Sequence, residues 1–228
     1  MNITIIPVEG IGEVAPGDDV AALIVDALPG PLVDGDIVVV THKIVSKAEG
    51  AITEAPTDAD RRRIVEEQAT AVIRRRGDLT IAVTAHGFIC ANAGVDRSNV
   101  APGMVVLLPE RPDRSAHLIR RKLEAATGTR LGVVITDTFG RPWRRGLTDV
   151  AIGISGLPAI VDYRGTADTF DQILEVTEVA VADEIAAAAD LVMGKASGVP
   201  AAIVRGLDLT GEGRATDLVR APDEDLFR

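Results

Sequence analysis

Short apolar runs rich in β-branched residues recur along the chain and are separated by helical patterns. Runs of this kind, bounded by glycine, proline or aspartate, are typical of strands. They lie at Ile3–Ile6, Ile37–Thr41, Leu79–Thr84, Met104–Leu108, Leu131–Asp137 and Ala201–Val204. Apolar residues spaced among polar ones predict helices at Pro56–Arg76, Arg114–Ala126 and Val176–Met193. Gly194 is then a C-cap for the third helix.

The order of these elements is not a regular strand–helix alternation, so we expect a mixed α+β fold whose strand directions stay open at this point. The 228 residues are enough for one large domain or two small ones. No stretch approaches the roughly 20 uncharged residues of a membrane helix. The first residues lack the basic and apolar regions of a signal peptide. A single cysteine excludes an internal disulfide, and we expect a cytoplasmic protein.

The formal charge of −10 argues against nucleic acid as a partner, because phosphate backbones require a basic surface. An acidic protein can still bind a phosphorylated ligand through a divalent cation, an arginine cluster, or both. Candidates for both are present in this chain.

Two motifs that superficially indicate nucleotide binding are weak. The segment 10–15 fits the loose dinucleotide pattern, but Pro16 and Gly17 follow at once, and a helix capped by Asp18 or Asp19 is the better prediction. The segment 193–197 resembles the end of a P-loop, but Ala189 stands where that motif requires glycine. We therefore expect neither a Rossmann site nor a P-loop.

The segment 134–146 carries the most chemistry. A hydrophobic strand leads into Asp137 and Thr138, whose oxygens could hold a hard cation. A glycine turn follows with Arg141, Arg144 and Arg145, whose forked guanidinium groups could clamp phosphate or carboxylate oxygens. The alternative is a capping aspartate followed by a solvated basic loop.

Two further segments leave similar choices open. Asp96 and Asn99 supply oxygen donors three positions apart, and with Asp137 they could bracket one or two metal ions. The alternative is an Asx turn bonded to its own backbone. Lys47 could contact a nucleotide phosphate or be a surface lysine near Glu49. The three histidines lack a zinc spacing, so each is better explained as structural, and Cys90 has no activating neighbour.

Taken together, these segments resemble the coenzyme F420-0:γ-glutamyl ligase family. The resemblance covers nearly the whole chain in seven ordered blocks and is far more specific than any one of them. The blocks are 7–10 with 16–19, 44–50, 92–99, 134–141, 151–156, 181–186 and 204–206.

The resemblance implies a GTP-dependent ligase that phosphorylates the lactyl carboxylate of coenzyme F420-0 and then joins L-glutamate to it, singly or successively. It implies Mg²⁺ or Mn²⁺, with K⁺ as a further candidate, a two-lobed fold with mixed and antiparallel sheets, and an intertwined homodimer. The implied metal ligands are Asp96, Asp137 and Thr138. The implied catalytic residues are Asp137, Arg141 and Arg144. The implied nucleotide contacts are Ile11, Gly12, Glu13, Val14, His42, Lys43, Lys47, Asn99, Gly194, Lys195, Ala196 and Ser197.

Two positions depart from the family pattern. His42 stands where many members have a small hydroxyl residue, so the nucleotide contact is expected to differ there. Lys195 replaces an acidic residue expected after the Met-Gly pair of archaeal-type members, which makes this loop a weak candidate for a metal ligand. The tail 223–228 resembles the segment that leads into a flavin-binding reductase domain in actinobacterial relatives, so we expect a standalone ligase or the first domain of a fusion. A metal-dependent phosphohydrolase and a non-catalytic binding module remain the alternatives.

Overall fold

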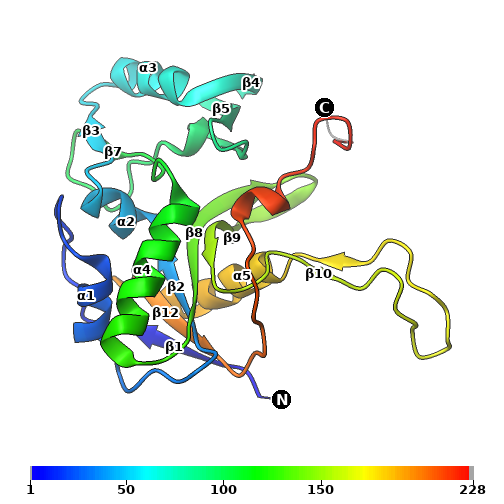
Figure 1. The fold of residues 1–228 in the computed structure, drawn as a ribbon. Helices are drawn as coiled ribbons and strands as arrows, with labels where there is room; N and C mark the ends of the chain where they lie inside the picture. The colour runs from blue at the N-terminus through cyan, green and yellow to red at the C-terminus, as the bar shows by residue number, and fades with distance from the viewer. Residues whose placement is uncertain (1, 226–228) are drawn as a thin grey trace.

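A five-stranded mixed sheet forms the centre of the molecule in the computed structural model, which describes residues 2–225 (Figure 1). The strand order is β1-β12-β2-β8-β9, and β2 pairs with β8 in parallel, while the other three pairs are antiparallel. The strands are β1 (Thr4–Val8), β2 (Ile37–Thr41), β8 (Gly132–Arg141), β9 (Arg144–Ser155) and β12 (Ala201–Arg205).

Helices cover both faces of this sheet. The side chains of Ile37–Val40 and Ala201–Val204 are all buried, which is expected of central strands covered on both sides. Helix α4 crosses one face with α1 packed beside it, and α5 lies behind the sheet (Figure 1). The α-helices of the described residues are α1 (Val20–Asp26), α2 (His42–Ala48), α3 (Asp58–Gln68), α4 (Pro112–Thr127) and α5 (Val181–Met193).

A smaller lobe is built from the chain between α2 and α4 (Figure 1). It contains the pair β3 (Ile52–Glu54) and β7 (Met104–Val106), and the sheet β4 (Ala69–Arg76), β5 (Leu79–Thr84) and β6 (Ile89–Ala91). A 3₁₀ turn at Asn92–Gly94 follows. The small lobe has its own small hydrophobic cluster, which contains Ala55, Ile64, Val65, Val95 and Val105.

An arm projects from the body between β9 and α5 (Figure 1). It consists of the short pair β10 (Val161–Asp162) and β11 (Glu178–Val179) and the loop between them. Phe170 and Val176 are strongly exposed on this loop. A 3₁₀ turn at Ala215–Leu218 precedes the C-terminus, and residues 226–228 of the predicted tail lie outside the described residues.

Two of the predicted helices are partly wrong. The segment Pro56–Arg76 divides into α3 and strand β4, because the exposed run after Gln68 contains β-branched residues and pairs antiparallel with β5. Gly77, at φ 58°, occupies the turn of this hairpin. The helix expected from Val176 begins only at Val181, because residues 178–179 pair with β10.

The predicted glycine turn at Gly140 is also wrong. Strand β8 continues through Gly140 to Arg141, and the turn to β9 falls at Pro142 and Trp143. Asp137 therefore lies within the strand and not at its end. Pairing with β9 extends β8, and this long-range register is invisible in the local pattern.

Other predictions are confirmed. The fold is mixed α+β with two lobes, mixed and antiparallel sheets, and five α-helices among the described residues. Asp19 caps α1 by accepting hydrogen bonds from Ala21 N and Ala22 N, so no helix starts at the glycine pattern of segment 10–15. Gly194 caps α5. None of the helices in residues 2–225 is long and apolar enough to cross a membrane.

Candidate active site

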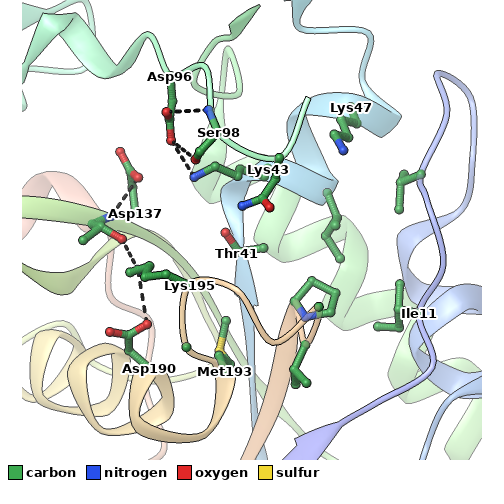
Figure 2. Close-up of a pocket in the computed structure, with 18 of the residues that line it drawn as sticks. Ile11, Thr41, Lys43, Lys47, Asp96, Ser98, Asp137, Asp190, Met193 and Lys195 are labelled. Atoms are coloured by element: carbon green, nitrogen blue, oxygen red, sulfur yellow. Dashed lines mark hydrogen bonds and ion pairs between the residues drawn. The ribbon is translucent and has the colours of Figure 1, made fainter. Parts of the chain in front are cut away.

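A cavity of about 640 Å³ lies where the small lobe meets the edge of the central sheet (Figure 2). Its wall combines five chain segments: the loop after β1, the start of α2, the loop after β6, the strands β8 and β9, and the loop after α5. Chemically active side chains from these segments face it: Glu13, Lys43, Lys47, Asp96, Asp137, Thr138, Asp149, Asp190 and Lys195. Segments far apart in sequence thus converge on one concave site, as expected of an active site.

Asp137 forms the floor of this cavity from within β8. Its carboxylate points towards Asp96 across the cavity (Figure 2). Buried His42 lies beneath it, with Nε2 at 3.3 Å from Asp137 Oδ1. Burial opposes the charge of this carboxyl, but His42 and then Lys43 outweigh it and lower the pKa of Asp137. The carboxylate is therefore ionised at neutral pH and fixed in direction.

Asp96 forms the opposite side of the cavity and belongs to the small lobe. Lys43 Nζ lies 2.8 Å from its Oδ2, while Ser98 donates through N to Oδ1 (2.8 Å) and through Oγ to Oδ2 (2.7 Å). Burial opposes ionisation, but these partners outweigh it and lower the pKa of Asp96 to about 2. The Asx-turn alternative is thus also realised, because the same carboxylate bonds its own backbone and faces the cavity.

A second polar cluster lines the same cavity beside Asp137. Successive side chains of a strand point to opposite faces, so Thr138 diverges from Asp137. Thr138 donates to Asp149 Oδ1 (2.6 Å) and accepts a hydrogen bond from Lys195 Nζ. The same ammonium lies 2.8 Å from Asp149 Oδ1 and 3.2 Å from Asp190 Oδ1. Strands β8 and β9, helix α5 and the loop after it are therefore joined through one cation.

The remaining wall combines apolar surface with one ion pair. Lys47 Nζ lies 2.6 Å from Glu13 Oε1, which ties α2 to the loop after β1. Apolar residues from the two flanking loops complete this side of the cavity: Ile11, Val14, Met193, Val199 and Pro200. Apolar surface beside lysines is suited to a ligand with a ring and phosphates.

Several predicted residues are not brought to the cavity. Arg141 and Arg144 are exposed in the β8–β9 hairpin, where Arg141 Nη2 donates to Arg145 O (2.9 Å). His42 lies under Asp137 and not on the cavity surface. Ala196 and Ser197 are not among its lining residues, whereas the other predicted nucleotide and metal residues line it.

The sequence interpretation missed two carboxylates of the site, Asp149 and Asp190. Asp149 is almost fully buried and stands directly opposite Thr138 in the β8–β9 register. Asp190 lies on the last turn of α5. Only the hairpin register could have indicated the first, and nothing local marked the second. Cys90 is buried and the pKa of its thiol is raised to about 12 by burial, so the expectation of no activating neighbour agrees with the structure.

The donors present fit a hard divalent cation. Asp96 and Asp137 offer ionised carboxylates that face each other, and Mg²⁺ is commonly held by one or two carboxylates with substrate phosphates and waters. Within residues 2–225, no group of three or more histidine, cysteine, aspartate or glutamate side chains forms a ready-made metal cage. The remaining ligands of a metal ion at this site would therefore come from the bound substrate and from water.

The fold and this cavity are those of a two-lobed, enzyme-like protein whose site is suited to a cation and phosphates. The F420-0:Gamma-glutamyl ligase family matches residues 10–206. The chain is 46% identical to the coenzyme F420:L-glutamate ligase of Methanothermobacter thermautotrophicus, and each chain is covered completely. It is 43% identical to that of Methanopyrus kandleri and 40% identical to that of Archaeoglobus fulgidus, over all of this chain and 98% and 97% of theirs. The chain belongs to the F420-0:γ-glutamyl ligase family, so the resemblance inferred from its sequence is confirmed.

Proposed function

We propose that this protein ligates L-glutamate to coenzyme F420-0, with GTP as the energy source, and can add further glutamates in succession. One observation carries the proposal: two carboxylates with lowered pKa values face each other across a lysine-lined cavity. The chain that forms this cavity is similar along its full length to proteins named coenzyme F420:L-glutamate ligase.

The proposed reaction has two steps. A carboxylate oxygen of the acceptor attacks the γ-phosphorus of GTP, so an acyl phosphate forms and GDP leaves. The amine of glutamate then attacks the acyl carbon, phosphate leaves with the bonding electrons, and the nitrogen loses a proton. Positioning and charge stabilisation supply most of the catalysis in phosphoryl transfer.

The chain's own residues would serve these steps as follows. Asp96 and Asp137 would hold Mg²⁺ or Mn²⁺, which neutralises phosphate charge when bound. His42 orients the Asp137 carboxylate from below. Lys47 is placed to exchange Glu13 for a phosphate oxygen, because both face the cavity. The apolar loops beside it would cover the guanine.

A homodimer is part of the proposal. Trp143 and Leu147 on the β8–β9 hairpin are exposed, as are Phe170 and Val176 on the arm. Exposed apolar side chains on projecting elements are typical of interaction surfaces. A second copy covering them would also bring the arginine hairpin near another chain. Light scattering after gel filtration should give twice the 23.9 kDa of the chain.

Mass spectrometry of the acceptor tests the activity. The protein is incubated with F420-0, GTP, L-glutamate and Mn²⁺, and controls omit GTP or the metal. The expected product is heavier by one or more glutamyl residues and is absent from both controls. GDP release with an unchanged acceptor would replace the ligase with a phosphohydrolase. If neither product nor GDP forms, while GTP binds, a non-catalytic binding module is the better assignment.

A further inference from the structure

Lys195 is bound in a way unusual for a half-exposed lysine. An ammonium group has three N–H donors, and here three oxygens surround it: Thr138 Oγ1, Asp149 Oδ1 and Asp190 Oδ1. The partners come from β8, β9 and α5. Partial burial opposes the charge, but Asp149 and then Asp190 outweigh it and raise the pKa of Lys195. The side chain is therefore a cation held between three oxygens.

The oxygen cluster exists independently of this lysine. Asp149 has only 4% of its side chain exposed, and its second oxygen, Oδ2, accepts from Thr136 Oγ1 at 3.0 Å. Thr138 donates to Oδ1 on the other side. Two cross-strand hydroxyls thus hold the carboxylate inside the β8–β9 hairpin. A buried carboxylate in this position needs a counter-cation.

The geometry points to Lys195 as a built-in cation that fills this oxygen cluster and excludes a second metal ion, so that the active site takes one divalent ion, at Asp96 and Asp137. This inference rests on the proposed function and deepens it, because phosphoryl-transfer sites use either one or two ions.

Distance and charge support the exclusion. A Mg²⁺ ion would bind about 2.0–2.1 Å from a carboxylate oxygen. Lys195 Nζ lies 2.8 Å from Asp149 Oδ1, so an ion on that oxygen would collide with the ammonium or be repelled by it. Without the lysine, the two carboxylates of Asp149 and Asp190 would carry a charge of −2 beside a hydroxyl oxygen. Such a set attracts a divalent cation.

The Asp96 side of the cavity also has a lysine 2.8 Å from a carboxylate oxygen, and the difference lies in its second carboxylate, Asp137. Lys43 binds one oxygen of Asp96, while Asp137 approaches His42 and has its Oδ1 bonded by its neighbour's backbone N. No lysine is paired with Asp137 among the described ion pairs. The second oxygen of Asp137 is therefore the available ligand of the cavity.

The test counts Mn²⁺ ions. Free Mn²⁺ is measured by electron paramagnetic resonance during titration of the nucleotide-free protein, with tetramethylammonium as the only buffer cation so that no K⁺ enters the cluster. Wild type should bind about one Mn²⁺ per chain and Lys195→Ala about two. Lys195→Arg keeps a cation and should stay near one. Lys122→Ala removes a surface lysine paired with Asp19 and should not change the count.

The other possible counts test the exclusion and the proposed metal site separately. Two ions in wild type, or the same count in wild type and Lys195→Ala, would overturn the exclusion, because a merely structural lysine would not change the count when removed. No ion in wild type and one in Lys195→Ala would retain the inference and reject the proposed Asp96–Asp137 metal site. If neither binds Mn²⁺, both ideas fail. Should Lys195→Ala not fold, wild-type crystals soaked in Mn²⁺ replace it, and an anomalous peak beside Asp149 would refute the inference.

Discussion

The floor and the roof of the cavity are built differently. The floor is the central sheet, in which β2 and β8 are paired. These strands belong to the large hydrophobic core, to which the helices on both faces of the sheet also contribute. The roof carries Asp96 and belongs to the small lobe, whose own hydrophobic cluster is small and contains Ala55, Ile64, Val65, Val95 and Val105. Local stability follows buried apolar contact, so the roof should open more easily than the floor.

This difference suggests a division of labour. Asp137 is held in a strand by pairing with Val150 of β9, one residue beyond the last pair between β8 and β2, so its position is set before any ligand arrives. Asp96 is held by Lys43 and Ser98, two contacts that a cation or phosphate could replace. A rigid floor with an adjustable roof suits a site that must admit a large coenzyme and then exclude water.

Replacing the floor carboxylate should have the largest effect. Asp137→Asn keeps the shape of the side chain but removes the charge, and ligation should fall by about 10²–10³-fold, as for other groups that stabilise developing charge. Turnover is followed by mass spectrometry of the acceptor. Asp78→Asn, on the exposed β4–β5 hairpin, is the matched control and should remain active. Normal turnover in Asp137→Asn would remove this residue from the active site.

Substitutions that create a cavity in one core or the other should show whether the floor and the roof differ in stability. Leu123→Ala empties a fully buried position of α4 and should lower the global free energy of unfolding by about 2–5 kcal/mol. Ile64→Ala in α3 should mainly reduce the protection of small-lobe amides in hydrogen exchange. Urea unfolding and native-state exchange measure the two effects. Equal loss of protection in both lobes after Ile64→Ala would contradict a separately opening roof.

Changing the support beneath the floor should cost less than changing the floor itself. His42→Gln removes the ring under Asp137, and the affinity for Mn²⁺ should fall by about 10–100-fold, as for other groups that orient metal ligands. Titration calorimetry gives the affinity, and circular dichroism checks the fold. An unchanged affinity would show that the strand alone fixes the carboxylate.

The smallest expected effect is a shift in titration at the roof. The pKa of Asp96 is about 2, below its ordinary value, so its contribution to stability is present above about pH 4 and is lost as pH falls through about 2. Lys43→Met removes the main partner, so the titration midpoint of Asp96 in the folded protein should move to higher pH. Carboxyl ¹³C NMR follows the titration directly. A midpoint still near 2 would show that Ser98 alone stabilises the charge.

The sequence by itself determined the elements whose signals are local. The β-branched runs predicted β1, β2, β8 and β12, helical spacing predicted α4, and aspartate and glycine predicted the caps of α1 and α5. The ordered motifs also predicted the family, and they indicated Asp96, Asp137 and Lys47 as residues of one site. These signals survive because propensity, capping and hydrophobic period act within a few residues.

Only the tertiary structure decided what pairing and packing at long range impose. The run after Gln68 is a strand because β5 lies beside it, although its charges fit a helix. Asp149 joins Thr138 through the register of a hairpin, and Lys195 reaches it across 46 positions of sequence. The arginines were expected in the cavity, but the same hairpin carries them away from it. Contacts of this kind depend on how whole elements meet, and no short window of sequence contains that information.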